Sequence, residues 1–572
     1  MCNNRPSLSY LISLTKFRTL FFALMVFSSF TIFYHLGSNS LHNGDEALYA
    51  IISREMLITG DWLTPQVQGE PCFTKPPLKF WLTASCFRFF GTSEWVIRFW
   101  SAAAAVACVF FTVLLAKELF GEKEALWSGF SLATCFHFMY EHCAKTGEMD
   151  AIQLFFLISS LYFLIRSEKN PRLLTISLAL MGLASLTKNF AGFLPFGIGL
   201  LYLLVTGKWR NYRVSGAIQA VLLFLVISSG WIIAMVLMHK HTFLNEFFIQ
   251  QVYNRATSTE YGMGVNEARS LTGGFFFIGK TILKGFYPWS LLLLPCLVWA
   301  FLQIPHWRKD GRILLLIWLV SFGTVLLLCK NKLHWYVLPI YPAASILIGK
   351  FIVETLVDVR INWEKILACV FLFCGFFLLL PKCSYNPFPL RAVNSRVSTL
   401  VLNPYPIAAL LLAVGCIIIW IFIARKFSRL AQYFIPAVLL VYAVAIVIPP
   451  LRYASHRSEI QKLTLAIAQQ TKTSEHTLYL CGIPESVFEH TDLLCKPPKI
   501  AKWYFSIIPN IRISFFAGDK EKICQPRETG RNNLFLMPNL YYQQIQSIRP
   551  HQFLASQRVR GKIYVLISPS KE

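Results

Sequence analysis

The stretch His42-Asn43-Gly44-Asp45-Glu46-Ala47-Leu48-Tyr49-Ala50 follows a long apolar run, residues 19–36, and places two adjacent carboxylates directly after it. Further along, Thr74-Lys75-Pro76-Pro77-Leu78 holds a lysine beside a rigid Pro-Pro pair. Polar turns between long apolar runs are typical of chains that cross a membrane repeatedly. A carboxylate supplies a proton acceptor and a fixed lysine supplies an anion contact. The two segments therefore predict chemistry on a charged lipid at the bilayer surface.

The composition supports a membrane protein. The chain has 572 residues, of which 55% are hydrophobic and 15% charged, whereas a soluble domain carries roughly 25% charged residues. The apolar runs approach the ~20 residues that cross a bilayer. The net charge of +25 lies mostly in short loops, and no basic stripe with interleaved aromatics occurs in a soluble domain. We therefore predict membrane lipids, and no nucleic acid, as partners.

The apolar runs predict an all-α membrane domain over residues 1–450 with thirteen transmembrane helices. Clusters of Lys and Arg recur in alternate loops, and the positive-inside rule places those loops in the cytoplasm. The outer loops 37–96 and 239–273, the Glu148–Asp150 turn and the Lys330–His334 turn then face outward. The predicted helices lie near residues 19–36, 97–116, 124–140, 150–166, 172–187, 190–206, 215–238, 274–303, 311–329, 335–357, 363–381, 404–424 and 430–449.

Residues 451–572 have a different character. A polar helix-like stretch, Ser458–Gln470, is followed by short strand-like runs. This pattern predicts a small soluble α/β domain, on the outer, periplasmic side because the number of spans is odd. The fifteen cysteines show no metal-ligand spacing, and one disulfide among those of the tail remains open. The strand-like runs are Thr477–Cys481, Arg512–Phe516, Asn533–Leu536 and Ile563–Ile567.

Two outward turns carry the candidate catalytic acids. Asp45 and Glu46 precede an amphipathic stretch, residues 47–57, that fits a helix lying along the interface. Glu148 and Asp150 stand in the next outward turn, before an apolar helix. Acids also favour the first turn of any helix, so capping is the alternative reading. Acidic turns in both of the first two outer loops favour a functional reading, with the carboxylate as general base toward an acceptor hydroxyl.

Basic groups in the outer loops are the candidate phosphate contacts. Pro76 favours an extended Lys75 beside the carboxylate loop. Positive charge on the outer face runs against the topological bias, which makes it informative. Contact with anionic headgroups is the alternative. Histidines such as His137 and His142 form no H-E-x-x-H pattern, so the support for a divalent metal is weak and no cofactor is predicted. The other candidate contacts are Arg255, Lys332, His334 and Lys188.

The assembled motifs resemble membrane glycosyltransferases of the GT-C fold. The resemblance is strongest to bacterial lipid A 4-amino-4-deoxy-L-arabinose transferases, within the protein O-mannosyltransferase superfamily. It covers roughly residues 20–350 by motif, and beyond them the number of spans and the outward C-terminal domain agree. Besides the Asp-Glu loop and Asp150, it rests on Gly60-Asp61-Trp62, Lys75-Pro76-Pro77-Leu78, Trp81-Leu82-Thr83, Leu186-Thr187-Lys188, Lys332-Leu333-His334, Tyr336, Leu338-Pro339 and Pro342.

The resemblance implies roles for these residues. Asp45 would be the main catalytic carboxylate, with Glu46 beside it, and Asp150 a second essential acid. A polyprenyl phosphate donor would be held by a set of basic and hydroxyl groups. That set comprises Lys75, Arg255, Lys332, His334 and Lys188, with Tyr341 as a weaker member.

The chain also departs from the family pattern. Leu48 stands where the family usually has Arg, so one phosphate contact is absent or supplied elsewhere. Thr74 replaces the acid that precedes Lys-Pro-Pro, and the expected His near Arg269 is not evident. In the family, the replaced acid and the expected His belong to the proposed metal site. The departures argue against a metal role and leave the sugar open.

The prediction is therefore an inverting glycosyltransferase of the bacterial inner membrane. It would move a sugar from polyprenyl (undecaprenyl) phosphate to lipid A or a related envelope acceptor on the periplasmic face. Transfer to protein Ser/Thr or to another glycan is the alternative within the enzyme class. A transporter or flippase is disfavoured, because the charged groups cluster in outer loops and no repeat is visible.

Overall fold

The computed structural model describes most of the chain up to residue 354 and five strands of the C-terminal part. The described residues are 8–37, 41, 45–67, 69–188, 190–257, 271–307, 311–354, 476–481, 511–516, 533–538, 543, 551–559 and 562–569. Statements below on what is absent refer to these residues.

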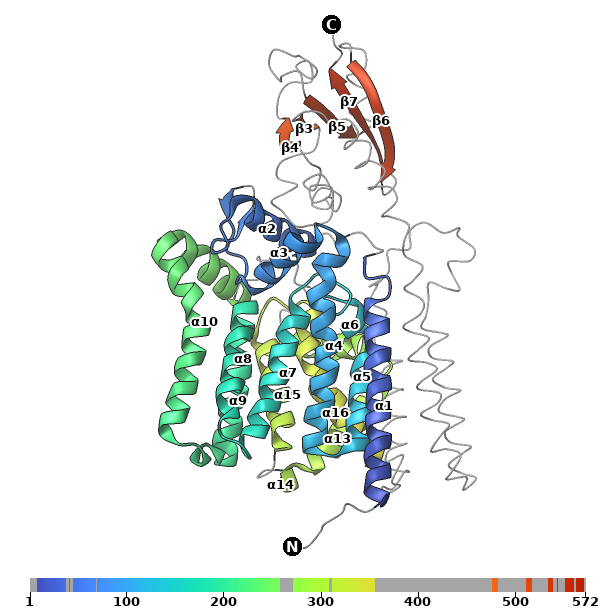
Figure 1. Ribbon diagram of the computed structural model, residues 1–572, viewed down its shortest axis with the longest axis vertical. Coiled ribbons are helices and arrows are strands. Elements are labelled where there is room, and N and C mark those ends of the chain that lie inside the picture. The colour runs from blue at the N-terminus through green and yellow to red at the C-terminus, as the bar shows by residue number, and fades with distance from the viewer. Residues whose placement is uncertain are drawn as a thin grey trace, which may run out of the picture.

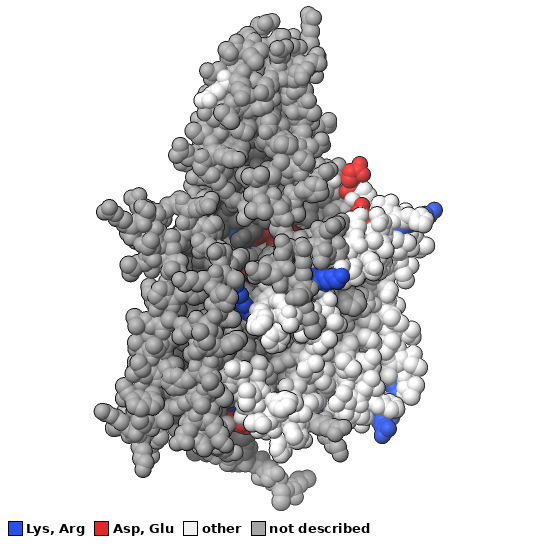
Figure 2. All heavy atoms as spheres, turned by 180° about the vertical axis from the view of Figure 1, so that it is seen from behind, with Lys and Arg blue, Asp and Glu red and all other residues white. Residues whose placement is uncertain are grey.

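The body of the molecule is a bundle of apolar helices (Figure 1). Within the described residues, four segments are long and apolar enough to cross a bilayer: Glu94–Leu119, Asp150–Ser167, Val214–Asn254 and His334–Ile352. Figure 2 shows the molecule from behind, and the described surface of the helical part is mostly uncharged there. A lipid-facing surface requires this. The helices of the bundle are α1 (Leu8–Phe33), α4 (Glu94–Leu119), α5 (Glu122–Ala133), α7 (Asp150–Ser167), α8 (Leu173–Thr187), α9 (Leu194–Thr206), α10 (Val214–Phe243), α13 (Ser290–Leu302), α15 (Ile313–Leu328) and α16 (Tyr341–Ile352).

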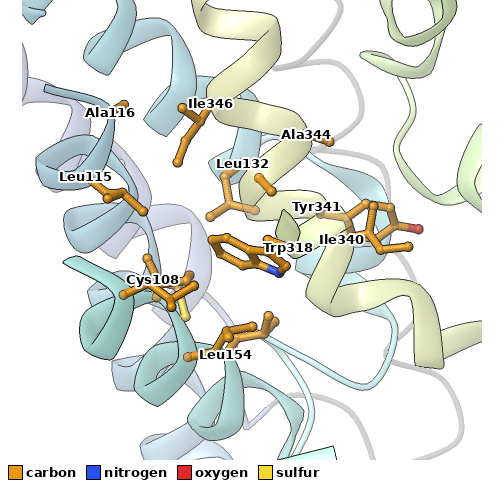
Figure 3. Packing of buried hydrophobic residues seen from close by; sticks show 14 of the residues in the cluster. Cys108, Leu115, Ala116, Leu132, Leu154, Trp318, Ile340, Tyr341, Ala344 and Ile346 are labelled. Atoms are coloured by element: carbon orange, nitrogen blue, oxygen red, sulfur yellow. The ribbon is translucent and has the colours of Figure 1, made fainter. Parts of the chain in front are cut away.

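The interior of the bundle is packed with large side chains, among them two tryptophans whose indole N–H groups are hydrogen-bonded. Trp318 lies among aliphatic residues of α4, α5, α7 and α16 (Figure 3). Its indole N–H donates to the carbonyl of Pro339 at 2.8 Å. Trp289 donates in the same way to Thr134 Oγ1 at 2.9 Å. Because lipid offers no hydrogen bonds, such internal pairing is needed wherever a polar atom is buried.

The predicted spans up to residue 354 coincide with helices, but four of them are divided or begin as a 3₁₀ helix. The 190–206 span begins as the 3₁₀ helix η1 (Phe190–Phe193) before α9. The 124–140 span divides into α5 and α6 (Phe136–Tyr140), and the 274–303 span into α12 (Leu271–Gly285) and α13. Pro288 lies in the second break, where a proline cannot donate a helical hydrogen bond. The 335–357 span begins as a 3₁₀ helix, η5 (His334–Ile340). The predicted spans beyond residue 354 lie outside the described residues, and the total of thirteen stays a prediction.

One end of the bundle is capped by the segment between α1 and α4 (Figure 1). It contains α2 (Asp45–Thr59), the short hairpin β1 (Gln66–Val67) and β2 (Glu70–Pro71), and α3 (Leu78–Phe90). The helix predicted after Asp45 is α2, but instead of one buried side it is buried around most of its circumference, including Ala47, Tyr49, Ile51 and Ile52. Tyr49 packs against Phe80 of α3, with ring centroids 5.6 Å apart. This contact packs α2 against α3, the helix that follows the lysine segment.

The C-terminal strands form one five-stranded sheet in the order β4-β3-β5-β7-β6. β3 is parallel to both of its neighbours, and β7 is antiparallel to both of its own. Four strands fall on the predicted strand-like runs, whereas β6 was not predicted. The predicted helix Ser458–Gln470, and Cys495 and Cys524, lie outside the described residues. The strands are β3 (His476–Cys481), β4 (Ile511–Phe516), β5 (Asn533–Pro538), β6 (His551–Val559) and β7 (Lys562–Pro569).

Candidate active site

Three carboxylates from two separate turns gather around one tyrosine. Asp45 lies in the first turn of α2, Asp150 begins α7, and Glu148 stands just before it. The Tyr49 hydroxyl donates to Asp45 Oδ2 at 3.0 Å. Burial raises the pKa of Tyr49 well above its usual value, and the charges of Asp45, Glu148 and Asp150 raise it further. The structure therefore brings together acids from the first two acidic turns.

Glu148 is the most deeply enclosed of the three acids, with 3% of the residue exposed. Burial raises the pKa of its carboxyl well above the usual value, and the charges of Asp45, Glu46 and Asp150 add to this. Lys188 opposes the shift only in part. Glu148 thus retains its proton at pH values where an exposed glutamate is ionised.

Lys188, at the end of α8, is paired with Asp150. Its Nζ lies 2.5 Å from Asp150 Oδ1 and 5.7 Å from the centroid of the Tyr336 ring. Burial alone would lower the pKa of Lys188, but the Asp150 carboxylate more than compensates, so the pKa is raised. The predicted phosphate contact Lys188 is therefore a charged partner of Asp150 in this structure.

Glu46 forms a buried ion pair that ties the site together. Its Oε1 accepts from Arg98 Nε at 2.7 Å and from the Gly147 amide at 2.6 Å. Arg98 also donates to the Leu36 carbonyl at 2.9 Å. A Cβ at Gly147 would lie 2.5 Å from Ile97 Cγ2, so this close approach needs glycine. These contacts give Glu46 an anchoring role between α2, α4 and the second acidic turn, and its predicted catalytic role stays a prediction.

Lys79 is a buried cation that sequence reasoning missed. Its Nζ donates to the Ile97 carbonyl at 2.9 Å and to Ser101 Oγ at 3.2 Å. Ser101 in turn donates to the Glu148 carbonyl at 2.5 Å. Burial lowers the pKa of Lys79 to about 8, although Glu148 and Glu46 oppose the shift. The available signal was a lysine inside an otherwise apolar helix, where a charge needs a partner.

Lys79→Met is expected to change how stability depends on pH. A lysine with a pKa of 10.5 when unfolded and about 8 when folded lets stability rise with pH between those values, because the unfolded chain binds more protons. From about pH 7 to about pH 9.5 the wild-type chain should gain about 2 kcal/mol relative to the variant. Thermal unfolding of the purified proteins at both pH values measures this difference.

The control for this experiment is Lys123→Met, since Lys123 lies exposed on α5. Its stability difference from wild type should be the same at both pH values. An equal pH response of the Lys79 and Lys123 variants would contradict the depressed pKa of Lys79.

Lys75 lies buried in the bend just before α3, which begins at Leu78 after the Pro76-Pro77 pair. Neighbouring Phe73 packs on the outer end of α10, with its ring centroid 5.1 Å from that of Phe243. The same apolar cluster contains Leu186, close in sequence to Lys188. The Lys75 segment is therefore held at the end of the bundle that carries the acids.

The remaining predicted phosphate contacts lie in two different parts of the structure. Arg255 begins α11 (Arg255–Thr257), and the next carbonyl, that of Ala256, accepts from the Lys330 amide at 3.0 Å. This contact brings the backbone of the Arg255 segment to the turn that contains Lys332, whose side chain is buried and donates to the Cys329 carbonyl.

His334 and Tyr341 face other partners. His334 Nδ1 lies 3.3 Å from Thr281 Oγ1. The hydroxyl of Tyr341 lies 2.9 Å from His137 Nδ1, and its ring stacks on Phe286 in the core (Figure 3). In the described residues, Tyr336 of η5 contacts the acid cluster indirectly, because its ring faces Lys188.

The described part of the chain contains no group of three or more His, Cys, Asp or Glu residues arranged to hold a metal ion. The acids are instead balanced by cations of the protein: Arg98 faces Glu46, Lys188 faces Asp150, and Lys79 lies close to Glu148 and Glu46.

Comparison with known proteins finds relatives over part of the chain. The family described as dolichyl-phosphate-mannose-protein mannosyltransferase matches residues 74–233. An undecaprenyl phosphate-alpha-4-amino-4-deoxy-L-arabinose arabinosyl transferase of Proteus mirabilis is 28% identical over 59% of this chain and 60% of its own length. An uncharacterized protein of Aquifex aeolicus is 30% identical over 55% of this chain and 69% of its own length. The matches to the transferase and to a further Aquifex protein span only about 60% of those relatives.

The fold has a solved counterpart in the crystal structure of ArnT from Cupriavidus metallidurans bound to undecaprenyl phosphate. That structure superposes with a TM-score of 0.67 over 96% of this chain and 98% of its own, at 22% identity. The fold is thus that of GT-C membrane proteins. In sequence the chain is similar to ArnT-like glycosyltransferases and, over residues 74–233, to the protein mannosyltransferases.

Proposed function

We propose that this protein transfers a sugar from a polyprenyl phosphate donor to an acceptor at the outer face of the bacterial inner membrane. The observation that carries the proposal is the cluster of Asp45, Glu148 and Asp150 around Tyr49, at the end of the bundle that also holds Lys75. Carboxylates beside fixed cations suit a reaction that removes a proton from one substrate and adds charge to another.

In this mechanism the acceptor hydroxyl attacks the anomeric carbon of the donor sugar. The bond from that carbon to the phosphate oxygen breaks, and its electron pair remains on the phosphate. Asp45 takes the hydroxyl proton as general base. Asp150, fixed by Lys188, orients the sugar. In-line displacement would invert the anomeric centre, an expectation from the fold analogy.

The leaving phosphate gains negative charge, so its binding groups should be cationic. Lys75 is the first of them, with Arg255 and Lys332 from the two adjoining segments. Leu48 occupies the place of a further family arginine, which leaves more of the task to these three. The long prenyl tail would remain in the bilayer while only the head group enters the site.

For the donor we propose undecaprenyl phosphate carrying an amino sugar, because the cluster is rich in acids and curated relatives are named for such a donor. For the acceptor we propose lipid A or a related envelope component. Transfer to protein Ser/Thr is the second candidate, since the matching family is described as a protein mannosyltransferase. The C-terminal domain, residues 451–572, would stand on the same periplasmic side.

Incubation of membranes with radiolabelled undecaprenyl-phosphate sugars tests the function. Lipid, protein and polysaccharide fractions are then separated, and label is expected in the lipid fraction. Membranes from cells that lack the protein are the control. Label in the protein fraction would replace the proposed acceptor, and absence of label from every fraction with each sugar tested would refute sugar transfer.

A further inference from the structure

His142 occupies an unusual position beside the acid cluster. It lies in the turn between α6 and α7 with a φ of 56°, a left-handed conformation that a non-glycine residue adopts at some cost. Its ring stacks on that of Trp335, with centroids 3.7 Å apart and planes 12° from parallel. Trp335 belongs to η5, as does Tyr336, whose ring faces Lys188. The stacked tryptophan therefore fixes the orientation of a histidine that the backbone alone would disfavour.

His142 joins the most buried acid to the surface. Its Nδ1 lies 3.7 Å from Glu148 Oε1. The side chain of Glu148 is 3% exposed, whereas that of His142 is 24% exposed. The amide of Gly147, next to Glu148, donates to the carboxylate of Glu46, next to Asp45, at 2.6 Å, so the two acidic turns lie against each other. A chain of titratable groups thus runs from Asp45 through Glu148 to His142 and the outside.

Substrates that reach Asp45 would cover it, so the proton it accepts needs a route that the substrates do not block. We propose that Glu148 and His142 form this route, a proton relay from Asp45 to the outer surface. The inference rests on the proposed sugar transfer, in which each turnover releases one proton.

The relay balances as follows in each turnover. The acceptor oxygen bonds to the anomeric carbon, the phosphate leaves with its electron pair, and Asp45 receives the hydroxyl proton. Glu148 passes its own proton to His142 Nδ1 and receives the proton of Asp45. His142 then releases a proton to water. The pKa of Glu148, raised by burial and by neighbouring acids, suits a carboxyl that is protonated at rest.

Several other charged or titratable groups face the pair. They are Asp45, Glu46 and Tyr49 on α2, Lys79 on α3, His137 and Glu141 at α6, Asp150 on α7 and Lys188 after α8. Within the described residues, Glu148 makes its ion-pair contact with His142. This contact makes His142 the exit of the relay.

The test uses His142→Ala in the full-length protein, with free imidazole as a replacement base. The variant should lose about tenfold or more in kcat, with KM unchanged. A loss near tenfold is smaller than the usual contribution of a general acid or base. Added imidazole should restore kcat, because the gap over Trp335 can accept the ring. A merely structural role would not respond to imidazole in this way.

His35→Ala is the matched control. His35 is also an exposed histidine with positive φ, 53°, and its ring lies 4.4 Å from that of Tyr34. It should retain wild-type kcat and show no response to imidazole. Glu148→Gln should lose kcat without imidazole rescue, and the double variant should lose no more than the larger single loss, because both residues serve one route.

Wild-type kcat in His142→Ala, or a loss of kcat that imidazole does not restore, would overturn the relay. If the alanine variant does not fold, His142→Gln is compared with His35→Gln, and equal kcat values would overturn it as well. If the wild-type protein transfers no sugar, the proposed function fails first. Transfer by wild type with a normal His142 variant refutes the relay alone.

Discussion

Asp45→Asn is expected to abolish sugar transfer, with kcat falling by about 10²- to 10⁴-fold. The amide keeps the size of the side chain, and its oxygen still accepts the hydrogen bond from the Tyr49 hydroxyl. It has no basic oxygen to receive the acceptor's proton. The measurement is the rate of label transfer from radiolabelled undecaprenyl-phosphate sugar by purified, reconstituted protein.

Tyr49→Phe is the companion variant. It removes only the hydrogen bond to Asp45 and should reduce kcat far less than Asp45→Asn does. Both variants should insert in the membrane and unfold near the wild-type temperature. Full transfer by Asp45→Asn would remove Asp45 from the mechanism and would direct attention to Asp150.

Arg98→Met is expected to destabilise the protein by about 3–5 kcal/mol, the usual cost of removing one partner of a buried ion pair. Both side chains of the Arg98–Glu46 pair are at most 2% exposed. The substitution leaves the buried Glu46 carboxylate without its cationic partner and leaves the carbonyl of Leu36 without this hydrogen bond. The unfolding temperature in detergent should fall sharply.

Arg166→Met supplies the control, because the Arg166–Glu118 pair is more exposed, at 41% and 18%. Its expected cost is about 0–1 kcal/mol. Adding Glu46→Gln to Arg98→Met should recover part of the loss, since no buried charge is then left unpaired. Equal destabilisation by Arg98→Met and Arg166→Met would contradict the anchoring role of the inner pair.

Much of the described fold could be predicted because lipid imposes a strong rule on sequence. Long apolar runs mark the helices, and α4, α7, α8 and α10 lie where the hydropathy pattern puts them. The breaks were harder to predict. The helices α12 and α13 separate within one apolar run, and η5 adopts a tighter helix within another, because packing and proline decide such breaks locally.

The candidate site was predictable to the level of its acidic turns. Asp45 and Asp150 stood out because charge is rare beside membrane helices. Their partners were not predictable, since pairing depends on contacts between residues far apart in sequence. Glu46 meets Arg98 and Asp150 meets Lys188 only in the folded chain. Lys79 escaped notice because its helix reads as apolar, and its partners Ile97 and Ser101 lie on the next helix.

The length of helix α10 makes the protein sensitive to the thickness of the surrounding bilayer. The stretch from Val214 to His239, before the helix kinks at Lys240, measures ~39 Å. It is longer than the hydrocarbon layer of about 30 Å, and only 22% of the apolar window in its span is buried inside the protein. Its overhanging end supports Phe73, next to Lys75. Acyl chain length, which governs how such a helix tilts, thereby becomes a variable that every reconstitution of this protein has to hold constant.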